Sequence, residues 1–174
     1  MYYFLLAFIV FLLDQGSKWL IAHNLELYQE VPVLGHFFLI TSHRNTGAAF
    51  SILEGQRWFF LSITSVVLIG IIYYMRILIR QRKKLLASAL GCLLGGAIGN
   101  FYDRAVAGEV VDFLQFNFVF SIFGAHVDYT FPIFNIADTA ISIGVALIIL
   151  DTFISGRREK EGNNKNHESE LKGT

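Results

Sequence analysis

The sequence is poor in charged residues and carries no excess of either sign. Only 16% of its 174 residues are charged, and the 14 basic residues balance the 14 acidic ones. Soluble domains usually carry about 25% charged residues, so this deficit favours a membrane protein. The balance also removes the overall basic bias that is typical of nucleic-acid-binding proteins.

Cysteine is almost absent as well. The single Cys92 excludes an internal disulfide and any metal site built from several cysteines. It lies in the apolar run 90–94, and we interpret it as a small packing residue. The five histidines are scattered and no H-E-x-x-H motif occurs. We therefore predict that the protein uses neither a metal nor another cofactor.

What the sequence has instead is long apolar runs. A transmembrane helix needs about 20 mostly apolar residues. Residues 58–75 and 85–102 contain no charge at all, and two further runs are interrupted by one or two charges. The predicted spans are residues 2–22, 57–79, 85–103 and 133–154. This pattern predicts an all-α membrane protein with four transmembrane helices, folded as a single domain over residues 1–154.

The first span has an alternative interpretation as a cleaved signal peptide. It begins Met1-Tyr2-Tyr3 without a basic region, and no A-x-A-like cleavage site follows its apolar run. A basic N-terminal region and an A-x-A-like cleavage site are both expected of signal peptides. We therefore favour a retained span.

Basic residues predict the orientation in the membrane. They gather in the link between spans two and three (Arg76, Arg80, Arg82, Lys83, Lys84) and in the C-terminal tail (Arg157, Arg158, Lys160, Lys165, Lys172). The other two links carry only three basic residues. The positive-inside rule then places both termini in the cytoplasm and residues 23–57 and 103–131 outside. The polar tail, residues 155–174, is predicted to be disordered.

The two outer segments contain strand signals. Residues 36–42 (HFFLITS) are typical of a short strand, and a turn is predicted at 45–47. From Leu114 to Ile122, apolar residues alternate with mostly polar ones, which is the period of a strand with one apolar face. We predict a small extracytoplasmic β platform. It either caps the helices or cradles an extended chain or a lipid, and the sequence leaves both open.

Several ionisable residues fall inside or at the ends of the predicted spans. With a rise of about 1.5 Å per residue, Asp14, Lys18, Asp103, Arg104 and Asp138 all lie in the outer half of the bilayer. Such residues are costly in a membrane and indicate a functional site by default. Structural roles remain open for the first four, because acid and base at i and i+4 can pair and charges at a helix end can reach headgroups. Asp138 has no cation nearby in sequence and should be protonated, paired or catalytic.

Four sequence blocks occur in order along the chain: DQGSK at 14–18 in the first span, NTGAAFS at 45–51 in the first outer segment, GNFYDR at 99–104 leading to VVDF at 110–113, and FPIFNIAD at 131–138. Together they resemble the lipoprotein signal peptidases, the bacterial signal peptidase II family, from about residue 4 to 154. The resemblance implies an endopeptidase that removes the signal peptide from diacylglyceryl-modified prolipoproteins by cutting before the lipidated cysteine. It also implies a bacterial inner membrane location, with prolipoprotein substrate and membrane lipid as partners, and we expect a monomer.

The same resemblance implies the site residues. The catalytic pair is Asp112 and Asp138. The residues implied to bind substrate or support the pair are Asn45, Asn100, Arg104, Asn135, Asp14 and Lys18. These types suit the chemistry, because two neighbouring carboxylates that share one proton can activate a water and protonate a carbonyl. Asparagine amides can hold an extended peptide, since each offers donors and acceptors.

One stretch departs from the expected pattern. The segment 115–130 is longer than we expect between the last two blocks, and it contains Asp128, which is a second candidate for the partner carboxylate.

Two other functions are open from the residues alone. A proton-coupled transporter would spread polar residues through the full membrane depth, and a non-catalytic subunit would tolerate Asn at both Asp112 and Asp138.

Overall fold

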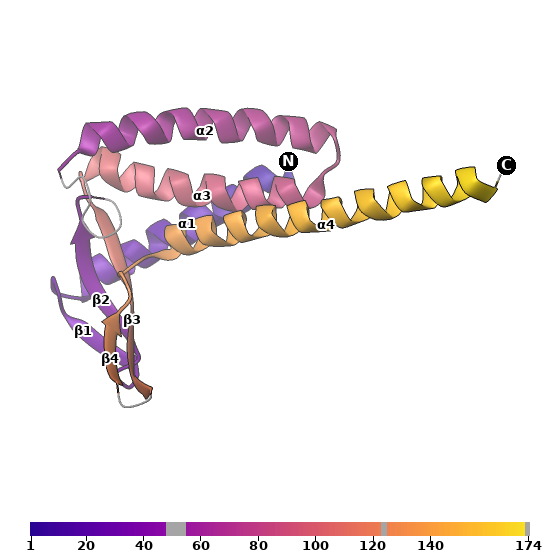
Figure 1. Cartoon of the computed structure of the whole chain (residues 1–174). Coiled ribbons are helices and arrows are strands. Elements are labelled where there is room, and N and C mark those ends of the chain that lie inside the picture. Colours follow the sequence, from indigo (N-terminus) through magenta and orange to yellow (C-terminus); the bar gives the residue numbers. More distant parts are fainter. Residues whose placement is uncertain (48–54, 123–124, 173–174) are drawn as a thin grey trace.

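Four long helices run side by side, and a small sheet lies at one end of them (Figure 1). The computed structural model describes residues 1–47, 55–122 and 125–172, so positions 48–51 of the NTGAAFS block lie outside the described residues. The helices are α1 (Tyr2–Asn24), α2 (Arg57–Arg80), α3 (Lys84–Val106) and α4 (Ile136–Lys172).

All four helices can cross a membrane by length and composition. In α4 the apolar part is Ile136–Arg157. The prediction of four spans is therefore confirmed. The antiparallel pair α2 and α3 is joined by a tight turn, in which Lys83 N–H donates to Leu78 O (3.0 Å) and Arg82 adopts a positive φ of 57°.

Helix α4 differs from the prediction at both ends. It begins at Ile136, not at 133, because Phe134 is extended and pairs with Leu114 of the sheet. Its backbone stays helical to Lys172, whereas we expected disorder from residue 155. Polarity alone suggested disorder, but Arg, Lys and Glu in this segment have high intrinsic helix propensity.

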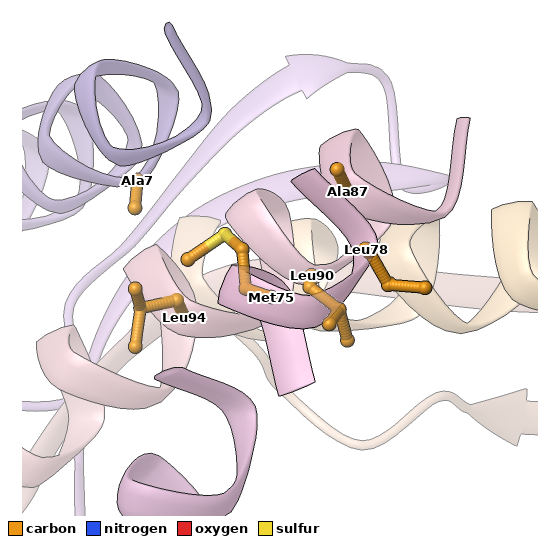
Figure 2. Close-up of a cluster of buried hydrophobic side chains, with 6 residues drawn as sticks. All are labelled: Ala7, Met75, Leu78, Ala87, Leu90 and Leu94. Atoms are coloured by element: carbon orange, nitrogen blue, oxygen red, sulfur yellow. The ribbon is translucent and has the colours of Figure 1, made fainter. Parts of the chain in front are cut away.

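The apolar core lies at the end of the bundle away from the sheet. Met75 and Leu78 of α2 are fully buried against Ala87 and Leu90 of α3. Figure 2 shows these side chains together with the other members of the cluster, Ala7 and Leu94. Small residues at the interface let membrane helices approach closely. This end of the bundle therefore stabilises the fold. The polar residues of the predicted site lie at the opposite end, beside the sheet.

Gly95 lies where α1 and α3 approach closely. A Cβ built on Gly95 would lie 2.5 Å from Ala7 O and 2.7 Å from Val10 Cβ. We expect Gly95→Ala to lower the free energy of unfolding by about 1–3 kcal/mol, because both contacts are too short to relax locally. Thermal unfolding in detergent measures the loss.

The matched control is Gly70→Ala in α2, where nothing lies within 4 Å of the added Cβ. That variant should keep or slightly gain stability, since alanine is the better helix former. Equal loss in both variants would show that the α1–α3 contact is not the cause.

The sheet contains four antiparallel strands in the order β1-β2-β3-β4. Their bounds are β1 (Glu30–Leu34), β2 (Phe38–Asn45), β3 (Val110–Ile122) and β4 (Ala125–Thr130). The first part of β3 pairs with β2, and its second part pairs with β4. The predicted β platform is thus confirmed as a sheet, and the long stretch 115–130 forms its β3–β4 hairpin.

The chain that follows β4 returns along β3. Phe134 N–H donates to Leu114 O (3.1 Å), and Leu114 N–H donates to Phe134 O (2.8 Å). This pairing brings the first turn of α4 beside the beginning of β3. It places Asp138 of α4 near Asp112 of β3, although 25 residues separate them in sequence.

Candidate active site

Asp112 lies on β3 with only 2% of its surface exposed. Asn135 Nδ2 donates to its Oδ1 (2.6 Å), and Asn45 Nδ2 donates to its Oδ2 (2.9 Å). Burial raises the pKa of Asp112 to about 6, and the nearby Asp138 carboxylate adds to this increase. The amides of Asn45 and Asn135 and the charge of Lys18 act in the opposite direction.

Asp138 lies in the first turn of α4, within the candidate span Ile136–Arg157 as the sequence predicted and close to the N-terminal end of that span. Its Oδ1 accepts a hydrogen bond from Asn100 Nδ2 (2.8 Å). Its Oδ2 accepts one from Asn135 N–H (3.2 Å), while Asp138 N–H donates to Asn135 Oδ1 (2.9 Å). This reciprocal pair is a capping box, so Asp138 also helps to begin the helix.

Asn135 joins the two aspartates. It is fully buried, and its side chain makes three hydrogen bonds. Its Oδ1 accepts from Asp138 N–H, and its Nδ2 donates both to Asp112 Oδ1 and to Asn100 Oδ1 (3.2 Å). Since every polar atom of this amide is used, the two carboxylates are held in one fixed arrangement.

A buried ionic cluster lies behind Asn100. Lys18 Nζ donates to Asn100 Oδ1 (2.9 Å) and Asp14 Oδ2 (2.8 Å), and lies 2.6 Å from Asp103 Oδ2. The predicted i,i+4 pair of Asp14 and Lys18 is therefore present. Asp14 Oδ1 accepts from Ala137 N–H (2.9 Å) at the start of α4. The cluster ties α1, α3 and α4 together at the level of the aspartates.

Gln15 belongs to this cluster, and the sequence analysis did not single it out. Its Nε2 donates to Asp103 Oδ1 (2.8 Å) and to Asp14 Oδ2 (3.2 Å). Its position beside Asp14, inside the DQGSK block, was the available signal. A polar amide in an apolar span needs partners just as a charge does.

Arg104 holds the end of β2. Its guanidinium donates to Gly47 O (2.8 Å) and lies over the ring of Phe60, 4.9 Å from the ring centre. Gly47 N–H donates to Asn45 Oδ1 (2.9 Å), which closes the predicted turn after Asn45. Arg104 thus supports the turn that carries Asn45.

One cavity of about 930 Å³ is lined by both aspartates and several of their polar neighbours. Its polar wall contains Asp112, Asp138, Asn45, Asn100 and Arg104. The rest of its wall contains the apolar Val110, residues 131–134 and Ile141, together with the hydroxyl-bearing Thr130, Thr139 and Ser142. Three of the predicted site residues, Asp14, Lys18 and Asn135, do not line it and lie behind those that do. The cavity therefore has one part lined by carboxylates and another part that is mostly apolar.

His43 also lines the cavity, and the sequence analysis missed it. It lies directly opposite Asp112 in the β2–β3 register, so both side chains share one face of the sheet. Asp128, the alternative carboxylate, is exposed on β4 opposite Val119 and is not among the residues that line the cavity. Within the described ranges, no group of three or more His, Cys, Asp or Glu is placed to hold a metal ion.

Comparison with known proteins identifies the family. The sequence profile described as Signal peptidase (SPase) II, peptidase family A8, matches residues 6–154. This chain belongs to the signal peptidase II family. The lipoprotein signal peptidases of Bacillus pumilus and Bacillus subtilis are 49% and 48% identical to it, and the alignments cover 92% of this chain and 98% and 99% of theirs.

Solved structures share the fold of this chain. Two structures of a bacterial membrane enzyme have TM-scores of 0.78 and 0.72 at 41% and 42% identity. The matches cover 91% and 86% of this chain, and 92% and 91% of the solved chains. The chain is thus an aspartic peptidase of family A8 and a multi-pass bacterial membrane protein, as the sequence blocks implied.

The hydrogen bond from Asn45 allows a test of the electrostatics around Asp112. We expect Asn45→Ala to raise the pKa of Asp112 above about 6, because a donor that favours the ionised carboxylate is lost. On the prediction that Asp112 and Asp138 share one catalytic proton, activity should then persist to higher pH. The measurement is the alkaline limb of the pH profile of kcat/KM, which should move upward.

Asn24→Ala is the matched control, since the exposed Asn24 side chain donates to Leu20 O of its own helix. Its profile should coincide with that of the wild type. An alkaline limb that moves to lower pH in Asn45→Ala would contradict the role given to this hydrogen bond.

Proposed function

We propose that this protein removes signal peptides from diacylglyceryl-modified prolipoproteins by cutting the bond before the lipidated cysteine. The observation that carries the proposal is the meeting of Asp112 and Asp138 on the wall of one cavity, with Asn135 bonded to both. The names of the relatives support the substrate class, because they are lipoprotein signal peptidases.

The reaction follows from a pair of carboxylates that share one proton. The ionised aspartate takes a proton from water, and the resulting hydroxide attacks the scissile carbonyl carbon. The protonated aspartate gives its proton to the carbonyl oxygen, which forms a neutral gem-diol. When the C–N bond breaks, the leaving nitrogen receives the proton taken from water, and a diol hydroxyl returns the other proton to the second aspartate.

The surrounding residues suit a peptide substrate. Asn45 and Asn100 reach the cavity and hold the aspartates by their amide groups. Their bonds to the carboxylates fix the pair in place before substrate binds, so little reorganisation is needed during the reaction. The apolar side of the cavity suits an apolar signal peptide and acyl chains.

The proposed arrangement in the membrane follows from charge. The turn between α2 and α3 carries Arg80, Arg82, Lys83 and Lys84, so we place this end in the cytoplasm. Both termini are then cytoplasmic, and the sheet and cavity lie near the outer leaflet of the cytoplasmic membrane. We further propose that residues 1–154 act as one peptidase domain and that the protein works as a monomer.

Purified protein and a synthetic prolipoprotein test the proposal. The wild-type protein should cleave the diacylglyceryl-modified substrate once, just before the modified cysteine, and mass spectrometry of both products locates the cut. The matched control substrate has the same peptide without the diacylglyceryl group and should be cleaved far more slowly. Equal cleavage of both would refute the proposed substrate class, while leaving the peptidase activity in place.

A further inference from the structure

The β3–β4 hairpin separates its side chains into an aromatic face and a polar face. Directly opposite residues in an antiparallel pair lie on the same face. Phe118 is opposite Tyr129 and Phe120 is opposite Val127, whereas Val119 is opposite Asp128 and Ser121 is opposite His126. We call the first set, Phe116, Phe118, Phe120, Val127 and Tyr129, the aromatic face. Within the described part of the hairpin, this face contains no charged residue.

The aromatic face is poorly covered by the rest of the protein. Phe120 is 44% exposed and Tyr129 is 46% exposed. Phe37, in the turn before β2, lies edge-on to Phe118 with ring centres 5.6 Å apart and extends the same apolar surface. Contiguous apolar surface of this kind usually marks a contact with another protein, a ligand or a membrane.

The level of the membrane surface can be inferred from the helices. Exposed Trp and Tyr residues gather at the two interfaces of a bilayer. Trp19, Trp58 and Tyr102 are exposed and lie near the ends of α1, α2 and α3 that face the sheet. Tyr2, Tyr73 and Tyr74 form the corresponding group at the other end. The sheet therefore joins the bundle at one lipid–water interface.

The aromatic face continues from this level. Figure 1 shows the hairpin extending away from the helices at their sheet-bearing end. Phe116 stacks on Phe134 with ring centres 5.8 Å apart, and Phe134 lines the cavity. The three phenylalanines Phe116, Phe118 and Phe120 alternate along one strand, so they share a side of β3.

We propose that the aromatic face of the β3–β4 hairpin binds the lipid–water interface of the bilayer. Phenylalanine and tyrosine enter the boundary between headgroups and acyl chains, and the polar face, with Asp128 and His126, remains in water. Because the aromatic face is uncharged, binding does not depend on anionic lipid. The contact holds the sheet at the membrane surface and so keeps the cavity at the level of lipid-anchored substrates.

The position of a single tryptophan tests this directly. Trp19 and Trp58 are replaced by Phe in the full-length protein, and cleavage activity confirms that this background folds. Phe120→Trp then reports on the aromatic face, and Ser121→Trp is the matched control on the polar face. Both are reconstituted in phosphatidylcholine vesicles that carry nitroxide groups near the headgroup or on the acyl chain. A parallel set of vesicles contains phosphatidylglycerol.

The expected result is strong quenching and blue-shifted emission for tryptophan at position 120, equal in both kinds of vesicle. Tryptophan at position 121 should instead be quenched by iodide in the water. Similar quenching at the two positions would overturn the proposal. Quenching at 120 that appears only after substrate is added would also overturn it and would assign the face to the substrate. Both outcomes are independent of which aspartates are catalytic.

Discussion

Asp138→Asn and Asp112→Asn are each expected to reduce the rate of prolipoprotein cleavage by at least about 10³-fold. General acid–base catalysis contributes about 10²–10⁴ in rate, and an amide can neither take a proton from water nor supply one. In the proposed mechanism the two aspartates act on the same water and carbonyl, so the loss of one leaves the other without a function. The measurement is single-turnover cleavage of the diacylglyceryl-modified substrate.

Asp138 requires particular care, because it also caps α4. Its Oδ2 accepts from Asn135 N–H, and its Oδ1 accepts from Asn100 Nδ2. An asparagine keeps one acceptor for these two donors, so part of the cap survives and loss of a cap costs only about 0.5–2 kcal/mol. Asp138→Asn should therefore remain folded, and the thermal unfolding midpoint checks this.

Asp128→Asn is the control for both variants. Asp128 is exposed on β4, so its replacement should change neither activity nor stability. If Asp128→Asn abolished cleavage and Asp138→Asn did not, the pair would have been assigned to the wrong residues. Wild-type activity in both Asp112→Asn and Asp138→Asn would instead support a non-catalytic subunit.

The second large effect is expected on stability. Lys18→Met should lower the free energy of unfolding by about 3–5 kcal/mol, because it leaves two buried carboxylates without their cation. Lys18 is 3% exposed, and its ammonium group lies within 2.8 Å of Asp14 and 2.6 Å of Asp103. Methionine fills a similar volume, so the loss reports the charge and not a cavity. Unfolding in detergent with increasing denaturant measures it.

Two further variants identify the cause. Lys84→Met replaces an exposed lysine at the start of α3 and should change stability by less than about 0.5 kcal/mol. Adding Asp14→Asn and Asp103→Asn to Lys18→Met removes the unpaired charges and should recover part of the loss. No recovery in the triple variant would mean that the packing of Lys18, and not its charge, stabilises the bundle.

The sequence predicts the spans well because their signal is local. Runs of about 20 residues without charge are long enough to cross a membrane as helices, so the ends of α2 are found to within one residue and those of α3 to within three. The alternation from Leu114 to Ile122 likewise predicts β3, since its period is set by the strand itself. The pair Asp14 and Lys18 follows from helical spacing alone.

The start of α4 is different, because it depends on a contact distant in sequence. Residues 131–134 are as apolar as a membrane-spanning helix, but the backbone of Phe134 forms its hydrogen bonds with Leu114 of β3. Asp138 therefore lies in the first turn of the span, nearer to its end than the sequence predicted. No local pattern reveals this, since the competing partner is 20 residues away.

The site itself could be predicted only in part. An aspartate in an apolar run indicates Asp138 on physical grounds, whereas Asp112 was found through the family resemblance, because an aspartate after a helix is usually solvated. Its near-complete burial is what distinguishes Asp112. His43 could not be predicted for a similar reason. It reaches the cavity because it pairs with Asp112 between β2 and β3, and the sequence does not show this pairing.

The most direct test of the central claim, that Asp112 and Asp138 act as one catalytic unit, is a double-mutant cycle on cleavage. The four proteins are the wild type, Asp112→Asn, Asp138→Asn and the double variant, each measured in single-turnover reactions with the diacylglyceryl-modified substrate. Residues that act as a unit are strongly non-additive, so the double variant should be no slower than the slower single variant. A double variant whose loss is the product of the two single losses, or a single variant that cleaves at the wild-type rate, would contradict the claim.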